Sequence, residues 1–178
     1  PIWRRGQESA RVISPRVQNM AVTALGRSPG THGPVTGEVV HFADLAALDA
    51  AQEGSLDGKI AFISARMKRT QSGAGYGPVV QGRSLGPFVA AQKGARALII
   101  RSVGTDNSRF PHTGNMSGST PGVAVPSAAI SNADADLLVA LLERPAPVTF
   151  ELDLDVGMDD ENIGVSYNVI GEFNGRDD

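Results

Sequence analysis

The sequence predicts a strand-rich mixed domain of strands and short helices, and three observations support this. First, 21 glycines and 11 prolines interrupt the 178-residue chain, a composition that suits short strands better than a helical bundle. Second, aromatic residues make up only 5% of the chain, so Val, Ile, Leu and Ala must build the core. Third, three short helical patterns separate the strand patterns irregularly, whereas a doubly wound sheet alternates regularly. We therefore expect an α/β or β-rich mixed domain with one ordinary core.

Short apolar runs bounded by turn residues predict the strands. The run 59–64 (KIAFIS) follows an Asp-Gly turn signal, and 148–156 (VTFELDLDV) alternates apolar with acidic residues, as half-exposed strands do. The region 1–33 is polar and interrupted and contains one candidate strand. In chain order, the predicted strands cover residues 20–25, 35–42, 59–64, 95–103, 126–130, 148–156 and 165–173.

Helical spacing and capping residues predict three helices. The clearest one follows Ser131, a predicted N-cap with Asp134 at the third helical position, and continues through Leu142. The other two predicted helices cover residues 43–52 and 85–93. Two stretches without either pattern, 66–82 and 104–122, are expected to be loops, and the second is long and polar.

Charge and composition exclude several classes of function. The net charge is −3, and no basic block alternates with aromatic residues, so nucleic-acid binding is not expected. The longest apolar runs are far shorter than a membrane span, and no signal-peptide pattern is present. The absence of cysteine excludes disulfides, thiolate metal sites and a cysteine nucleophile. Because the chain begins with proline, we expect a fragment or a processed product.

One motif suggests a serine hydrolase. Residues 82–86 (GRSLG) fit the G-x-S-x-G pattern, in which the serine lies on a turn between a strand and a helix. A helix is predicted after Ser84, but a glycine-rich loop precedes it, and His112 and Asp134 follow in an unusual chain order. The simpler interpretation is that Ser84 caps a helix.

Other motifs point more weakly to ligands. The run 73–77 (GAGYG) lacks the strand and the Lys-Ser/Thr pair of a phosphate-binding loop. The histidines, at 32, 41 and 112, lack zinc-ligand spacing, and the acidic residues between 153 and 161 lack EF-hand spacing and suggest a solvated strand and turn. Residues 115–117 (NMS) fit a short glycosylation pattern that occurs often by chance. From these residues alone we expect a soluble mixed domain without its own catalytic site.

Several motifs taken together resemble a known family. The stretch 91–103 (AQKGARALIIRSV), then 111–114 (PHTG), then 125–138 (VPSAAISNADADLL) resembles the protease-associated domain of carboxypeptidase Q and its bacterial relatives. Residues 56–60 (LDGKI) are similar to a strand start of that domain, and residues 166–172 (SYNVIGE) to the strand that re-enters the peptidase domain. The resemblance covers nearly the whole chain.

This resemblance implies a fold and a parent enzyme. It implies an α+β, β-rich domain, a β-sandwich or barrel-like sheet with short helices at its edges. Residues 1–32 would be an N-terminal flanking segment, 33–164 the protease-associated domain, and 165–178 the strand returning to a missing peptidase domain. The parent would be a secreted or periplasmic zinc-dependent amino- or carboxypeptidase whose zinc ligands lie outside this chain. The fragment itself would therefore hold no cofactor and would not be an enzyme.

The resemblance also implies an accessory role as active-site lid, substrate-access and interaction module. Its partners would be its own peptidase domain and the parent's peptide substrates, and self-association through unpaired strands is expected. The residues expected to face the cleft or a partner are Arg101, Ser102, His112, Thr113 and Gly114, although Arg101 is equally well interpreted as part of a strand-end salt bridge. The alternatives are a serine hydrolase using Ser84 and a free-standing module that binds peptides or glycans.

Overall fold

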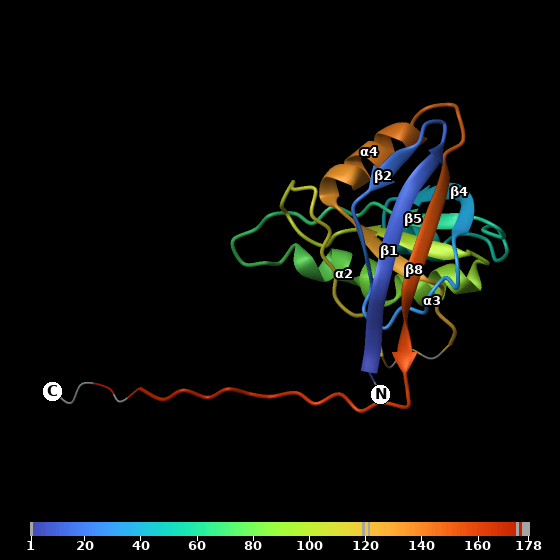
Figure 1. The fold of residues 1–178 in the computed structure, drawn as a ribbon. Helices are drawn as coiled ribbons and strands as arrows, with labels where there is room; N and C mark the ends of the chain where they lie inside the picture. Colours follow the sequence, from blue (N-terminus) through green and yellow to red (C-terminus); the bar gives the residue numbers. More distant parts are fainter. Residues whose placement is uncertain (1, 119, 121, 174, 176–178) are drawn as a thin grey trace.

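Eight strands in the described part of the chain join in one mixed sheet (Figure 1). The computed structural model describes residues 2–118, 120, 122–173 and 175. In chain order the elements are β1 (Ile2–Ser14), β2 (Gln18–Met20), β3 (Val22–Ala24), β4 (Val35–Phe42), α1 (Leu45–Asp49), β5 (Ile60–Ile63), α2 (Tyr76–Ser84), α3 (Gly86–Gln92), β6 (Ala97–Arg101), β7 (Ser127–Ile130), α4 (Asn132–Leu142) and β8 (Thr149–Asp159).

The sheet curls into a nearly closed barrel. Its strand order is β2-β1-β8-β4-β5-β6-β7-β3, with parallel pairing from β4 to β7 and antiparallel pairing elsewhere. The two edge strands, β2 and β3, are separated only by Ala21, so one extended segment spans both edges of the sheet. Side chains of β1 also reach β3, where Glu8 accepts a hydrogen bond from the Ala24 N–H and Arg5 donates to the Ala24 carbonyl. Closure of this kind leaves little free strand edge.

Two apolar clusters lie on opposite faces of the central strands. In β5, Ile60 and Phe62 belong to the cluster inside the barrel, and Ala61 and Ile63 belong to the cluster outside it. Alternate residues of a strand point to opposite faces, which explains why a short strand buried on both faces is apolar throughout. The inner cluster is completed by β1, β8 and α4, and the outer one by α1 and α3.

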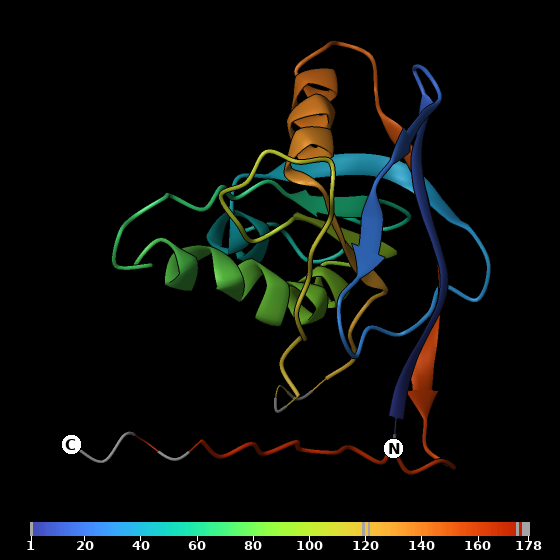
Figure 2. The same ribbon diagram turned by 60° about the vertical axis from the view of Figure 1, so that its left-hand side comes forward.

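Figure 2 shows the short helices packed around the sheet, with α1 and α3 against the outer face of its central strands. The predicted cap of α4 is confirmed, because the Ser131 side chain accepts a hydrogen bond from the Asp134 N–H. Asp44 caps α1 in the same way through the Ala47 N–H. The strand-rich α+β class, with a barrel-like sheet and short edge helices, is confirmed.

Three predicted elements differ from the structure. Residues 1–33, expected to be mostly irregular, contain the long strand β1, which pairs with β8 along most of its length. The predicted loop 66–82 ends in helix α2. The predicted strand 165–173 is wrong for this chain, because these residues are exposed and have no regular structure. Of the predicted loop 104–122, residues 119 and 121 lie outside the described residues.

The expected flanking segment belongs to the sheet. Residues 2–24 supply β1, β2 and β3, and β3 pairs with β7 rather than with the C-terminal tail. The strands before residue 33 and the strands after it therefore share one sheet. The junctions to a peptidase domain, before residue 33 and after residue 164, stay predictions, and residues 1, 174 and 176–178 lie outside the described residues.

Candidate functional site

Arg101 ends β6 with its side chain buried in the fold. Its guanidinium donates hydrogen bonds to the Ser64 carbonyl at 2.9 Å, the Asn132 carbonyl at 3.0 Å and the Asp136 carboxylate at 2.8 Å. Only 3% of this side chain is exposed. Arg101 thus joins β5, β6 and α4 through a strand-end salt bridge and does not present its side chain to a ligand.

The Arg101–Asp136 pair changes the pKa of both groups. Burial lowers the pKa of Arg101, and the hydrogen bond and charge of Asp136 oppose that effect. Burial raises the pKa of Asp136, but hydrogen bonds from Arg66 and Arg101 outweigh it, so its net pKa is lowered. The lowered pKa keeps Asp136 ionised at neutral pH, and its carboxylate forms an ion pair with the Arg101 guanidinium.

Ser102 anchors the long loop that follows β6. Its hydroxyl donates to the Ile130 carbonyl at 2.8 Å and accepts from the His112 N–H at 3.1 Å. The Ser102 side chain is buried, whereas the His112 ring is 43% exposed and lies 3.5 Å from the Asp106 carboxylate. Ser102 therefore holds the loop, and His112 is the group of this pair that an outside molecule can reach.

Thr113 and Gly114 continue the loop towards the barrel wall. The Gly114 carbonyl accepts hydrogen bonds from the Gly26 N–H at 3.0 Å and from the Thr113 hydroxyl at 3.0 Å. A Cβ added at Gly114 would lie 2.8 Å from the Arg83 guanidinium carbon. The loop is thus packed between the residues after β3 and the end of α2, and Gly114 permits that close approach.

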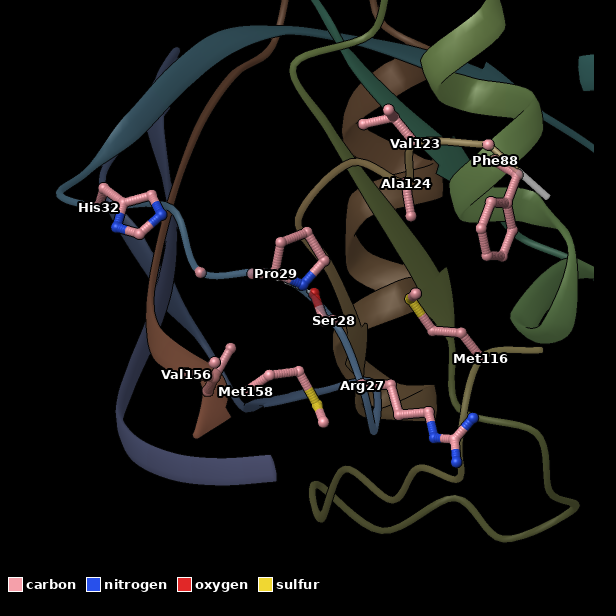
Figure 3. Close-up of a pocket in the computed structure, with 13 residues that line it drawn as sticks. Arg27, Ser28, Pro29, His32, Phe88, Met116, Val123, Ala124, Val156 and Met158 are labelled. Atoms are coloured by element: carbon pink, nitrogen blue, oxygen red, sulfur yellow. Dashed lines mark hydrogen bonds between the residues drawn. The ribbon is translucent and has the colours of Figure 1, made fainter. Parts of the chain in front are cut away.

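An apolar hollow of about 530 Å³ opens at the end of β8 (Figure 3). We call it the barrel-end hollow. Met116 and Met158 enter it from opposite sides, and Phe88 and Val123 line the wall opposite His32. Val123 is 83% exposed and Met158 is 50% exposed. The remaining lining residues are Arg27, Ser28, Pro29, Gly30, Gly122, Ala124, Val156 and Gly157.

The sequence did not reveal this hollow. Its walls come from four stretches of chain that are far apart: the segment after β3, the helix α3, the loop before β7 and the end of β8. Arg27 and His32 have positive φ angles of 71° and 54°, which non-glycine residues seldom adopt. Val123, which lines the hollow, lies between the predicted loop 104–122 and the predicted strand 126–130, and no sequence pattern marked it.

The other candidate sites are not assembled for catalysis. Ser84 is the last residue of α2 and is followed by α3, so it does not occupy the strand-to-helix turn of a hydrolase. His41 contacts the Ser64 hydroxyl at 2.6 Å and stacks on Phe62. Among the described residues, no three His, Asp or Glu side chains converge as metal ligands. The described residues therefore do not form a zinc site with three converging ligands.

The acidic stretch lies along β8 and its end. Asp159 pairs with Arg4 and accepts hydrogen bonds from Asn162, and Asp153 accepts one from Thr31. These contacts match the solvated strand and turn expected from the sequence. The glycine-rich run 73–77 lies at the start of α2, whose N-cap is Gly75. Separately, none of the helices in the described residues is long and apolar enough to cross a membrane.

Comparison with known proteins connects this chain to peptidases. Carboxypeptidase Q of Mus musculus is 31% identical over 98% of this chain, and that of Xenopus laevis is 32% identical over 98%. In both cases the chain spans 36% of the relative's length, so it corresponds to about a third of the curated relatives it matches. No family model matches the chain.

Solved structures of peptidases also contain a segment similar to this chain. The crystal structure of a peptidase M28 precursor from Shewanella amazonensis is 46% identical, with a TM-score of 0.82, over 88% of this chain and 36% of that one. An aminopeptidase from Aneurinibacillus, 20% identical with a TM-score of 0.58 over 87% of this chain and 33% of its own, shares the fold. The resemblance drawn from the sequence is thus confirmed: the chain is homologous to a segment of carboxypeptidase Q and of an M28 peptidase, as expected of a protease-associated domain from such an enzyme.

Proposed function

We propose that this chain is the protease-associated domain of a zinc-dependent exopeptidase that is secreted or periplasmic. The observation that carries the proposal is the alignment of 98% of the chain with about a third of carboxypeptidase Q. The parent would cleave amino acids or dipeptides from peptides, with its zinc held by a separate peptidase domain. The chain itself would be non-catalytic and would bind no zinc.

Within that parent, the domain would act as a lid and shape access to the cleft. The part proposed to face the cleft is the segment His112–Thr113–Gly114, whose first side chain is exposed. Arg101 and Ser102 would contribute indirectly, because their buried side chains fix the base of this loop. An exposed segment on a rigid scaffold is the usual arrangement for residues that contact a partner or substrate.

A His112→Ala variant of the longer polypeptide tests the lid role. The exposed Asn107, in the same loop, supplies the matched control Asn107→Ala. We expect His112→Ala to change kcat/KM for some peptide lengths more than for others while zinc content stays constant, and Asn107→Ala to change neither. Unchanged kcat/KM for every peptide length would contradict a cleft-facing His112, and a longer polypeptide without zinc and turnover would contradict the proposed parent.

We also propose that the isolated chain self-associates through its C-terminal tail. Ile163, Val165, Tyr167, Val169 and Phe173 are 73–98% exposed, and unpaired extended segments with apolar side chains tend to pair with another chain. Size-exclusion chromatography should show concentration-dependent oligomers that a chain ending at residue 162 does not form. A monomer at every concentration would contradict this proposal.

A further inference from the structure

The barrel-end hollow combines exposure with apolar chemistry. Val123 is 83% exposed and Met158 is 50% exposed, and the more buried Phe88 and Met116 line the same hollow. Larger apolar surfaces on soluble proteins commonly mark interaction sites. Methionine pairs suit such surfaces, because their flexible side chains adapt to a partner's shape.

The hollow lies next to the point where the barrel strands begin and end. Ile2, at the start of β1, pairs with Asp159, at the end of β8, and Met158 immediately before it lines the hollow. The tail then passes Ile2, because a Cβ on Gly164 would lie 3.3 Å from the Ile2 side chain. Figure 1 shows the tail leaving from this end. The tail therefore leaves the barrel from the end at which the hollow lies.

One wall of the hollow is firmly held. Ser28 accepts a hydrogen bond from the Trp3 indole at 2.9 Å through its carbonyl, and Thr31 bonds the backbone of Leu154. Between these anchors the backbone keeps Arg27 and His32 at positive φ. Such residues persist only where the surrounding structure fixes them, and they occur often at sites that clamp a ligand. The wall formed by 27–32 is thus a preformed surface.

We propose that the barrel-end hollow binds an apolar surface segment of the peptidase domain in the same polypeptide. This inference rests on the proposed function, in which the chain is about a third of a longer enzyme. A peptidase domain connected near Ile2 and beyond Asp159 lies beside the hollow at high effective concentration. Packing there would cover Val123 and Met158 and would fix the orientation of the whole domain relative to the cleft.

Single-cysteine labelling tests this placement, because the chain has no cysteine of its own. Val123→Cys and Met158→Cys report on the hollow. Val17→Cys is the control, since Val17 is 62% exposed in the turn between β1 and β2, at the other end of the barrel. In the 178-residue chain all three thiols should react quickly with a maleimide. In the longer polypeptide the two hollow thiols should react at least about tenfold more slowly, because interface cores are packed like protein interiors, and the thiol at position 17 should react as before.

Equal labelling rates at residues 123 and 158 in the two polypeptides would overturn the inference. Zinc content and turnover of the same longer polypeptide report separately on the proposed function, so an active enzyme with an open hollow would leave that function standing. Slow labelling in the 178-residue chain that depends on its concentration would assign the hollow to a second copy, which also overturns the inference. Slow labelling in an inactive longer polypeptide would support the packing and contradict the enzyme.

Discussion

Asp134, in the first turn of α4, accepts a hydrogen bond from the Ala21 N–H at 2.7 Å. Ala21 is the residue between β2 and β3, and its carbonyl accepts from the Ser131 N–H at 3.0 Å. The N-terminus of α4 therefore satisfies both backbone groups where the chain crosses between the two sheet edges. The same carboxylate pairs with Arg109 of the long loop, so one buried side chain joins helix, barrel closure and loop.

Asp134→Ala should destabilise the fold. The change leaves the Ala21 N–H unpaired in a part-buried position, and an unsatisfied buried donor costs about 1–3 kcal/mol. Urea unfolding followed by circular dichroism measures the free energy of unfolding. The exposed Asp49, on α1, gives the control Asp49→Ala, which should change stability by less than about 0.5 kcal/mol. Equal effects of the two variants would contradict the role assigned to Asp134.

Arg101→Met should cost more stability than Arg66→Met, although both arginines pair with Asp136. The Arg101 side chain is 3% exposed and also serves two backbone carbonyls, whereas the Arg66 side chain is 58% exposed. Loss of buried partners costs about 1–3 kcal/mol, and loss of an exposed pair about 0–1 kcal/mol. Thermal or urea unfolding of both variants checks the order, and a reversed order would show that Arg101 does not hold β6 to α4.

Stability should fall as the pH drops through the range where histidine titrates. Burial of the His41 ring lowers its pKa from the ordinary 6.5, an effect that Glu143 opposes and Arg101 reinforces. The unfolded chain therefore binds this proton more readily than the folded chain. The stability that neutral His41 contributes is present above about pH 6.5 and is lost as the pH falls from there towards the folded pKa.

His41→Gln tests that pH dependence. Glutamine cannot titrate, so the free energy of unfolding of this variant should change less between about pH 8 and pH 5 than that of the parent chain. A parent and a His41→Gln variant with the same pH profile would show that His41 does not carry the effect.

Ser102→Ala should loosen the long loop without unfolding the domain. The change removes the acceptor for the His112 N–H, so hydrogen exchange should accelerate at His112 and its neighbours. Exchange in β5 should stay slow, because its residues are fully buried. Ser72→Ala, in the exposed loop before α2, is the control and should leave exchange at His112 unchanged. Unchanged exchange at His112 in Ser102→Ala would contradict the anchoring role.

Elements fixed by local signals were predictable from the sequence. The helix after Ser131 carries its own capping residue. The continuous apolar run of β5 predicts a strand buried on both faces, and the alternation of apolar and acidic residues in β8 predicts a strand buried on one face. Two elements depend on distant partners and escaped prediction. In β1 the alternation is broken by an irregularity between Arg5 and Glu8, and its pairing with β8 joins residues far apart in sequence. In α2, the glycines and Pro78 predict a loop, although proline is tolerated in the first turn of a helix.

The candidate site was predictable only in part. The loop carrying His112 was found from its polar length and from the resemblance, but the burial of Arg101 and Ser102 depends on contacts with β5, β7 and α4. The prediction of a strand at 165–173 was wrong because the local pattern favours a strand but no strand among the described residues pairs with it, and an extended apolar run forms a strand only where a partner is present. The barrel-end hollow needs four distant segments, which no local pattern brings together.

The most direct test of the central claim is a paired measurement of zinc content and peptidase turnover, on the 178-residue chain and on the longer polypeptide. Dipeptides and aminoacyl reporters serve as substrates. If the chain is an accessory domain, the 178-residue chain should bind no zinc and cleave no substrate. The longer polypeptide should bind zinc and cleave the substrates. Stoichiometric zinc or real turnover in the 178-residue chain would contradict the account, because that chain would then contain a catalytic site of its own.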